Sequence, residues 1–146
     1  MGYIRIKKIN NSKYAYLVET KNTQSGPRQK VKKYLGRVFD VEKNSLAKKI
    51  NLGGNKYDFI RSLILREVNF KKLDKIEYKN FGFTKKGKEV TLKINDGFLS
   101  SYTLGRLIRF QKSKDLDKDA LLLANYFVQA GLTISEKEFV AYYQLL

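Results

Sequence analysis

Cysteine and histidine are absent from this sequence of 146 residues. Without cysteine the chain can form neither a disulfide nor a catalytic thiolate, which fits a cytoplasmic protein. Without histidine it has no imidazole to bind a metal or to act as a general base, so most familiar catalytic sites are excluded. We therefore expect a protein that is not an enzyme and that holds no metal and no cofactor.

Long apolar runs are also missing, and charged and apolar residues alternate from Tyr3 onward. The sequence thus predicts neither a membrane-spanning helix nor a signal peptide, and we expect no membrane partner. A hydrophobic fraction of 42% lies close to the usual globular range, so the chain should fold around a core.

Acidic residues are scarce, because thirty Lys and Arg stand against fourteen Asp and Glu and give a net charge of +16. Residues 1–56 hold fourteen basic and three acidic residues, residues 57–114 hold fourteen and six, and residues 115–146 hold two and five. A strongly positive field attracts polyanions and speeds their encounter with the protein. We expect the first two thirds of the chain to meet nucleic acid.

Three strands are predicted within residues 1–39. Residues 3–7 alternate, residues 13–19 are rich in aromatic and branched side chains, and a basic segment follows the polar loop that contains Pro27. Asn10, Asn11 and Ser12 are typical of a turn between the first two strands. Short connections of this kind favour an antiparallel β-meander.

The basic segment is Arg-Gln-Lys-Val-Lys-Lys-Tyr-Leu-Gly-Arg, residues 28–37. A period of two places its cations beside Tyr34 on one face, while Lys33 interrupts an apolar row and indicates a bulge near Gly36. Together with Tyr3 and the first strand, this face suits a phosphate backbone. The candidate nucleic-acid contacts are Arg5, Lys7, Arg28, Lys30, Lys32, Lys33, Tyr34 and Arg37. The alternative is a solvated edge strand whose lysines discourage aggregation.

The run Tyr16-Leu-Val-Glu19, followed by a polar loop and then by residues 28–37, resembles the N-terminal region of insertion-sequence transposases of the DDE type, notably archaeal ones. The resemblance covers about the first quarter of the chain and implies binding to the ends of a mobile element. Residues 57–146 do not resemble the ribonuclease-H-like catalytic domain of those enzymes, since Asp58, Asp74 and Asp96 stand in no catalytic context. The resemblance therefore implies nucleic-acid binding without transposition chemistry.

The middle of the chain predicts a linker, a helix and a β-hairpin. Residues 40–56 form the linker, with a short helix expected over residues 42–50, and residues 57–68 carry an apolar stripe at helical spacing. Residues 74–84 and 89–95 flank a basic turn and predict the hairpin. Its fragment Lys-Asn-Phe-Gly-Phe, residues 79–83, is partly similar to the aromatic strand of RNA-recognition and cold-shock domains. Secondary nucleic-acid contacts would be Lys79, Phe81, Phe83, Lys85, Lys86 and Lys88, although core positions suit both phenylalanines better.

Residues 98–146 predict three helices. Asp115 or Asp117 can cap the second, Gly131 ends it, and the Ser135 to Glu138 capping box opens the third. The last helix either closes the core, which we favour, or forms a protein interface such as a homodimer. The candidate interface residues are Phe139, Tyr142, Tyr143 and Leu146.

The sequence as a whole predicts an α+β protein with a basic meander (1–39), a linker (40–56) and an α+β unit with a helical tail (57–146). The function that we expect is non-enzymatic binding of DNA through the cationic face of the meander. An RNA-binding or ribosome-associated factor is the first alternative, and an adaptor or dimer that uses the C-terminal helices is the second.

Overall fold

The computed structural model describes residues 2–42, 50, 52 and 54–146. Its N-terminal strands β1 (Gly2–Ile9), β2 (Ser12–Thr23) and β3 (Gly26–Asp40) pair antiparallel, which confirms the predicted meander. Asn10 and Asn11 both have positive φ, 48° and 67°, as the tight turn between β1 and β2 requires.

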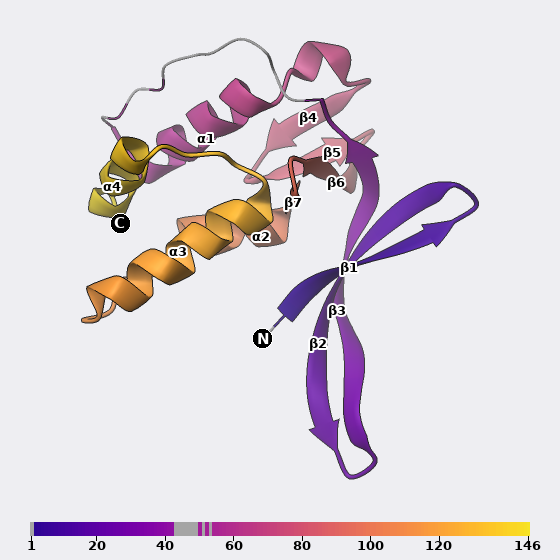
Figure 1. Ribbon diagram of the computed structural model, residues 1–146. Coiled ribbons are helices and arrows are strands. Elements are labelled where there is room, and N and C mark those ends of the chain that lie inside the picture. The colour runs from indigo at the N-terminus through magenta and orange to yellow at the C-terminus, as the bar shows by residue number, and fades with distance from the viewer. Residues whose placement is uncertain (1, 43–49, 51, 53) are drawn as a thin grey trace.

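β2 and β3 continue well beyond the end of β1. Gly2 of β1 pairs with Glu19, so among the described strands residues 20–23 of β2 pair only with residues 26–29 of β3. These two segments and their turn, residues 20–29, form a two-stranded arm that projects away from the helices (Figure 1).

A parallel pair joins the meander to the rest of the protein. Residues 37–40 of β3 lie beside residues 90–93 of β6 (Lys88–Ile94), which gives one sheet of order β1-β2-β3-β6-β5-β4. β7 (Gly97–Leu99) pairs antiparallel with residues 92–94 of β6. The sequence predicted the meander and the second β unit but not the pairing that makes them one sheet.

The predicted hairpin over residues 74–95 is wrong in one respect. Its first strand folds back on itself as β4 (Ile76–Lys79) and β5 (Gly82–Lys85), with Asn80 and Phe81 at the turn. Both turn residues have positive φ, 52° and 58°. The apolar and aromatic content of residues 74–84 suits a strand throughout, and no glycine marks the turn itself.

The helices are α1 (Lys56–Glu67), a 3-10 turn (Phe70–Lys72), α2 (Ser101–Ile108), α3 (Leu116–Ala130) and α4 (Glu136–Gln144). Asn55 caps the start of α1. Asp115 and the Ser135–Glu138 capping box begin α3 and α4, and Gly131 ends α3, as predicted. α2 is shorter than expected because residues 97–99 form β7 and Ser100 caps the helix. Most of the short helix expected over residues 42–50 lies outside the described residues.

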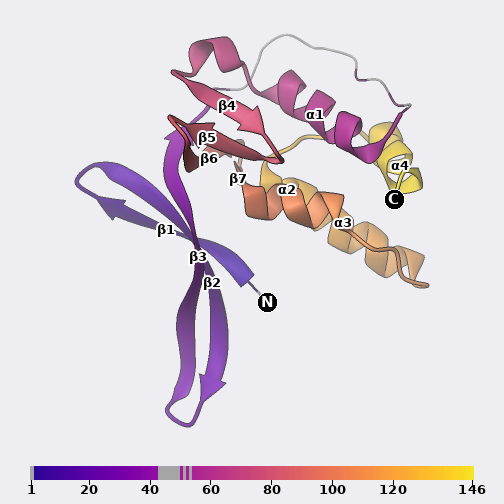
Figure 2. The same cartoon turned by 180° about the vertical axis from the view of Figure 1, so that it is seen from behind.

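Two apolar clusters hold the molecule together. The larger one lies among the helices and β4–β7, and the helices gather at one end of the molecule while the two N-terminal hairpins project from the other (Figures 1 and 2). The smaller cluster consists of Ala15, Leu35 and Val38, against which Phe98 and Tyr102 pack. The N-terminal sheet is therefore anchored at its inner face and leaves its remaining surface to solvent.

Candidate nucleic-acid interface

Two bulges in β3 decide which way its cations point. Ala15 pairs with Gly36 but Tyr16 pairs with Tyr34, and Leu17 pairs with Lys33 but Val18 pairs with Val31. Leu35 and Lys32 are thus the extra residues, and each bulge reverses the alternation of side chains. The sequence predicted a bulge near Gly36 but not the second one at Lys32.

The outer face of the meander carries aromatic rings among cations, and we call it the tyrosine face. Residues directly opposite each other in neighbouring strands share a face, and the register places these side chains together. They are Tyr3, Arg5, Lys7, Tyr14, Tyr16, Tyr34 and Arg37. Of these, Arg5, Lys7, Tyr34 and Arg37 were candidates from the sequence, and all four are exposed.

Ring contacts tie the tyrosine face together. The ring of Tyr34 lies 5.1 Å from that of Tyr16 and 6.5 Å from that of Tyr14, between ring centroids. The amine of Lys7 lies 5.2 Å above the Tyr16 ring. Loss of hydration, reinforced by the neighbouring tyrosines, raises the pKa of Tyr34. Tyr34 nevertheless remains 49% exposed.

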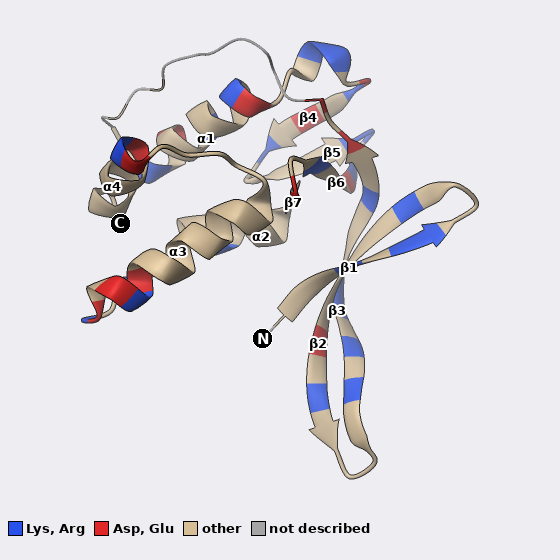
Figure 3. Ribbon diagram, viewed as in Figure 1, with Lys and Arg blue, Asp and Glu red and all other residues tan. Residues whose placement is uncertain are grey.

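Arg28 and Lys30 do not lie on the tyrosine face, which corrects the predicted single row of cations. Arg28 pairs with Lys21 and Lys30 with Glu19, both on the opposite side of the ribbon. The Lys32 bulge is the cause, because without it Arg28 and Lys30 would share the side of Tyr34. Lys21 and Arg28 lie on the arm and Lys30 at its base, all on the face opposite to Arg5 and Lys7, so the N-terminal sheet has cations on both faces. Basic residues occur along both strands of this hairpin (Figure 3).

Lys32 and Lys33 each have a carboxylate partner. The amine of Lys32 lies 3.2 Å from Glu19, and the amine of Lys33 lies 3.4 Å from Glu89 and 3.3 Å from the hydroxyl of Ser101. Both ion pairs are partly exposed, so each costs little to separate. These two candidates are weaker phosphate ligands than the six residues that have no ion pair within the described part of the chain.

The secondary candidates divide into three groups. Phe83 is fully buried in the core, as favoured from the sequence, whereas Phe81, for which a core position was also favoured, is exposed. Lys79, Phe81, Lys86 and Lys88 are exposed at the β4–β5 and β5–β6 turns. The amine of Lys85 lies 4.8 Å above the ring of Phe39, which also contacts Arg37, so Lys85 extends the tyrosine face.

α4 closes the core, as favoured from the sequence. Tyr142 is fully buried and donates a hydrogen bond of 2.8 Å to the carbonyl of Leu107, so it is wrong as an interface residue. Burial raises the pKa of Tyr142. The other three candidates, Phe139, Tyr143 and Leu146, are half-buried against the same core.

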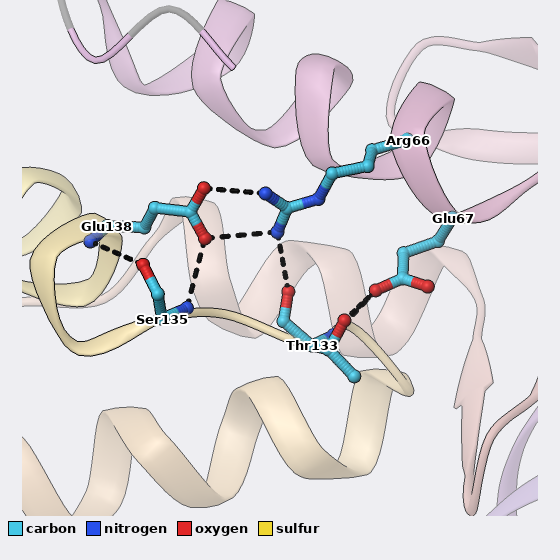
Figure 4. A network of polar contacts seen from close by, with 5 residues as sticks. All are labelled: Arg66, Glu67, Thr133, Ser135 and Glu138. Carbon is cyan, nitrogen blue, oxygen red and sulfur yellow. Dashed lines mark hydrogen bonds and ion pairs between the residues drawn. The ribbon is translucent and has the colours of Figure 1, made fainter. Parts of the chain in front are cut away.

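Charged residues in this region pair with one another. Arg66 of α1 donates to both carboxylate oxygens of Glu138 on α4, at 2.5 and 3.1 Å, and to the carbonyl of Thr133 at 2.9 Å (Figure 4). Glu67 accepts hydrogen bonds from the hydroxyl and the amide of Thr133. The hydrogen bond from Arg66 is the main reason why the pKa of Glu138 is lowered.

Sequence reasoning missed Tyr14 and Tyr16 as site residues. The signal was available, because they are spaced by two in a predicted strand and therefore share a face. What was missing is the register, which brings Tyr34 of the next strand against them.

No family model, no curated protein and no solved structure matches this chain. The function of the site is therefore inferred from its geometry. Within residues 2–42, 50, 52 and 54–146, no group of three or more acidic side chains is arranged to hold a metal ion. No helix formed by the described residues is both long and apolar enough to cross a membrane.

Proposed function

We propose that this protein binds nucleic acid without catalysing a reaction on it, and that the N-terminal sheet is the binding surface. The observation that carries the proposal is an excess of unpaired cations. Residues 2–40 contain ten basic and two acidic residues. Within the described part of the chain only Lys32 and Lys33 among these ten form ion pairs. The other eight have no carboxylate partner there, although Arg5 donates a hydrogen bond to Gln29, and Lys7 and Arg37 lie over aromatic rings. A phosphate backbone rewards each neutralised charge by releasing counterions.

Duplex DNA is the ligand that the shape of the sheet supports best. The major groove of DNA admits a two-stranded β-ribbon. The arm is such a ribbon, and its cations lie at Lys21 and Arg28 with Lys30 at the base. If the arm is inserted in the major groove, the DNA phosphates lie along both edges of the arm. Arg5 and Lys7 on the tyrosine face would then also reach phosphates. Phosphate contacts position a protein without reading bases, so we expect little sequence preference.

RNA is the second candidate, favoured by the exposed tyrosines. Unstacked bases in RNA loops and single strands stack on aromatic side chains, and Tyr34 is half exposed within a group of three tyrosines. Competition between duplex DNA and a structured RNA of equal length, at one fixed salt concentration, separates the two. The similarity to the N-terminal region of DDE transposases accords with DNA and stays a prediction.

The test removes four unpaired cations by replacing Arg5, Lys7, Arg28 and Lys30 with glutamine. A matched control replaces Lys71, Lys114, Lys118 and Lys137, which are exposed on the helical unit, and changes the net charge equally. Affinity for a 20-base-pair duplex is measured over a series of salt concentrations. The slope of log affinity against log salt should flatten by about 0.9 for each phosphate that the variant no longer neutralises.

The control variant should keep a nearly unchanged slope, because a change in overall charge alone acts weakly at a distance in salt. Equal weakening by both variants would show that the binding is a property of net charge and not of this surface. Retention of the full slope by the first variant would remove the N-terminal sheet from the interface.

A further inference from the structure

A small hollow lies between β3 and α2, where the β4–β5 turn forms its rim. Its volume is about 280 Å³, and Leu17 and Ile108 are its aliphatic lining residues. Lys33 from β3, Asn80 and Phe81 from the turn, and Arg109 at the end of α2 line its sides. We call this hollow the Phe81 pocket. It is somewhat smaller than pockets for drug-sized ligands, so it suits a single ring or nucleotide.

Phe81 occupies a backbone position that disfavours its side chain. Its φ is +58° and that of Asn80 is +52°, values that suit asparagine or glycine at a two-residue turn and penalise a bulky aromatic residue. Its ring is 38% exposed and has one aromatic neighbour, Tyr57, at 5.2 Å between centroids. Neither the turn nor the core explains a phenylalanine here, and strained residues of this kind cluster at functional sites.

Arg109 is placed over the pocket by a second locally costly residue. Gly105 lies inside α2, where glycine weakens a helix. A Cβ at this position would collide with the guanidinium of Arg109, with only 3.0 Å to its Cζ atom. Gly105 therefore makes room for Arg109 to lie back along the helix. No described residue forms an ion pair with Arg109 or a hydrogen bond with its side chain.

Lys33 supplies the second positive charge. Ser101 and Glu89 hold its amine at the pocket. Glu89 offsets one of the two cations, so these groups leave one net positive charge beside an exposed aromatic ring. An aromatic face with a cation next to it is the arrangement that takes a base and its phosphate.

We propose that the Phe81 pocket holds one unpaired nucleotide of the bound nucleic acid. The base stacks on Phe81, the amide of Asn80 reaches its polar edge, and the phosphate lies between Arg109 and Lys33. The inference rests on the proposed function, because the rest of the nucleic acid is bound by the N-terminal sheet. It adds that a duplex with a single-stranded extension is preferred to a blunt one.

The experiment compares two ligands, a blunt 20-base-pair DNA duplex and the same duplex with a three-nucleotide extension on each strand. The proteins are the wild-type chain, Phe81→Gly, Phe81→Tyr and Arg109→Gln, with Lys118→Gln on α3 as the control. Stacking of one base on an aromatic ring typically changes affinity by about tenfold. We expect the wild type to bind the extended duplex about tenfold more tightly than the blunt one.

Phe81→Gly should abolish this preference without weakening binding to the blunt duplex. Phe81→Tyr should retain the preference, since tyrosine keeps the stacking surface, and Arg109→Gln should reduce it. Glycine is better suited than phenylalanine to the backbone of this turn, so Phe81→Gly should remain folded. Lys118→Gln should leave the ratio of the two affinities unchanged.

Two results would overturn the pocket proposal alone. One is a wild type that binds both duplexes equally, and the other is a Phe81→Gly variant that keeps the preference. In either case binding of the blunt duplex, with its salt dependence, would still support the N-terminal sheet as the interface. A wild type that binds neither duplex would overturn both proposals.

Discussion

The helical unit and the N-terminal sheet use their charged side chains differently. In the helical unit, Arg66 and Glu138 bind each other with little exposure to solvent, 19% and 14% of the two side chains. In the N-terminal sheet, Arg28 and Lys30 point into solvent and have no ion pair within the described residues. The charges in the helical unit therefore stabilise the fold, whereas those of the N-terminal sheet are not needed for it.

Aromatic residues divide in the same way. Tyr142 and Phe127 are buried in the main core and pack edge to face. Tyr3 and Tyr34 of the N-terminal sheet remain 42% and 49% exposed. Exposed aromatic rings beside unpaired cations suit a nucleic-acid interface, whereas a hydrophobic core does not need them. Stability measurements on variants of the helical unit and of the N-terminal sheet test this division.

The largest expected effect is on the core aromatic Tyr142. Truncation of Tyr142 to alanine should lower the free energy of unfolding by about 3 to 5 kcal/mol, because it leaves a cavity and an unpaired carbonyl at Leu107. Tyr34→Ala should cost less than about 1 kcal/mol, since half of that ring is already in water. Urea denaturation measures both, and similar losses would contradict the division into a core and a binding surface.

The next effect concerns the junction between these two regions. Gly36 has φ of +89°, and a Cβ there would overlap the carbonyl of Glu89 on β6. Gly36→Ala should destabilise the protein by about 3 kcal/mol through backbone strain and the clash together. Gly87→Ala is the matched control, because its φ is +78° with open space around it, and should cost about 1 kcal/mol. Equal losses would mean that close packing against β6 is unimportant.

A smaller effect is the pH dependence that Glu138 contributes. Its pKa is lowered in the folded protein, mainly by the hydrogen bond from Arg66, from an ordinary value of 4.5. Its stabilisation is therefore present above about pH 4.5 and is lost as the pH falls through the lower folded value. Glu138→Gln should flatten the curve of unfolding free energy against pH below 4.5. A curve with the same slope in the variant would assign acid sensitivity to other carboxyl groups.

The smallest effect is expected on the arm. Replacement of Lys21, Arg28 and Lys30 with glutamine should change the unfolding free energy by about 0.5 kcal/mol or less for each residue, because all three are exposed and lack ion pairs among the described residues. Thermal denaturation without ligand provides the measurement. A marked stabilisation on their removal would show that mutual repulsion strains the arm, and a marked destabilisation would give these cations a structural role.

Local patterns predicted the elements of this fold well. The alternation in residues 3–7, the Asn10–Asn11 turn and the Ser135–Glu138 capping box each depend on neighbours in sequence, and the structure confirms them. The same holds for the buried stripe of α1.

Features that depend on distant partners were missed. The bond between Arg66 and Glu138 spans 72 residues, and the pairing of β3 with β6 has no local signal. The bulge at Lys32 adds only one residue to β3, yet it moves Arg28 and Lys30 to the other side of the ribbon. The residues of the candidate site were therefore exposed as predicted, but their grouping on one face was not predictable from period alone.

β3 forms one side of the arm and, at its other end, pairs with β6. A chain cut after Asp40 would lose β6 and leave the backbone of residues 37–40 without its neighbour. Such a bare edge pairs readily with another copy of itself. An isolated N-terminal fragment would thus self-associate, and transplanting the surface to a new scaffold requires a substitute for β6.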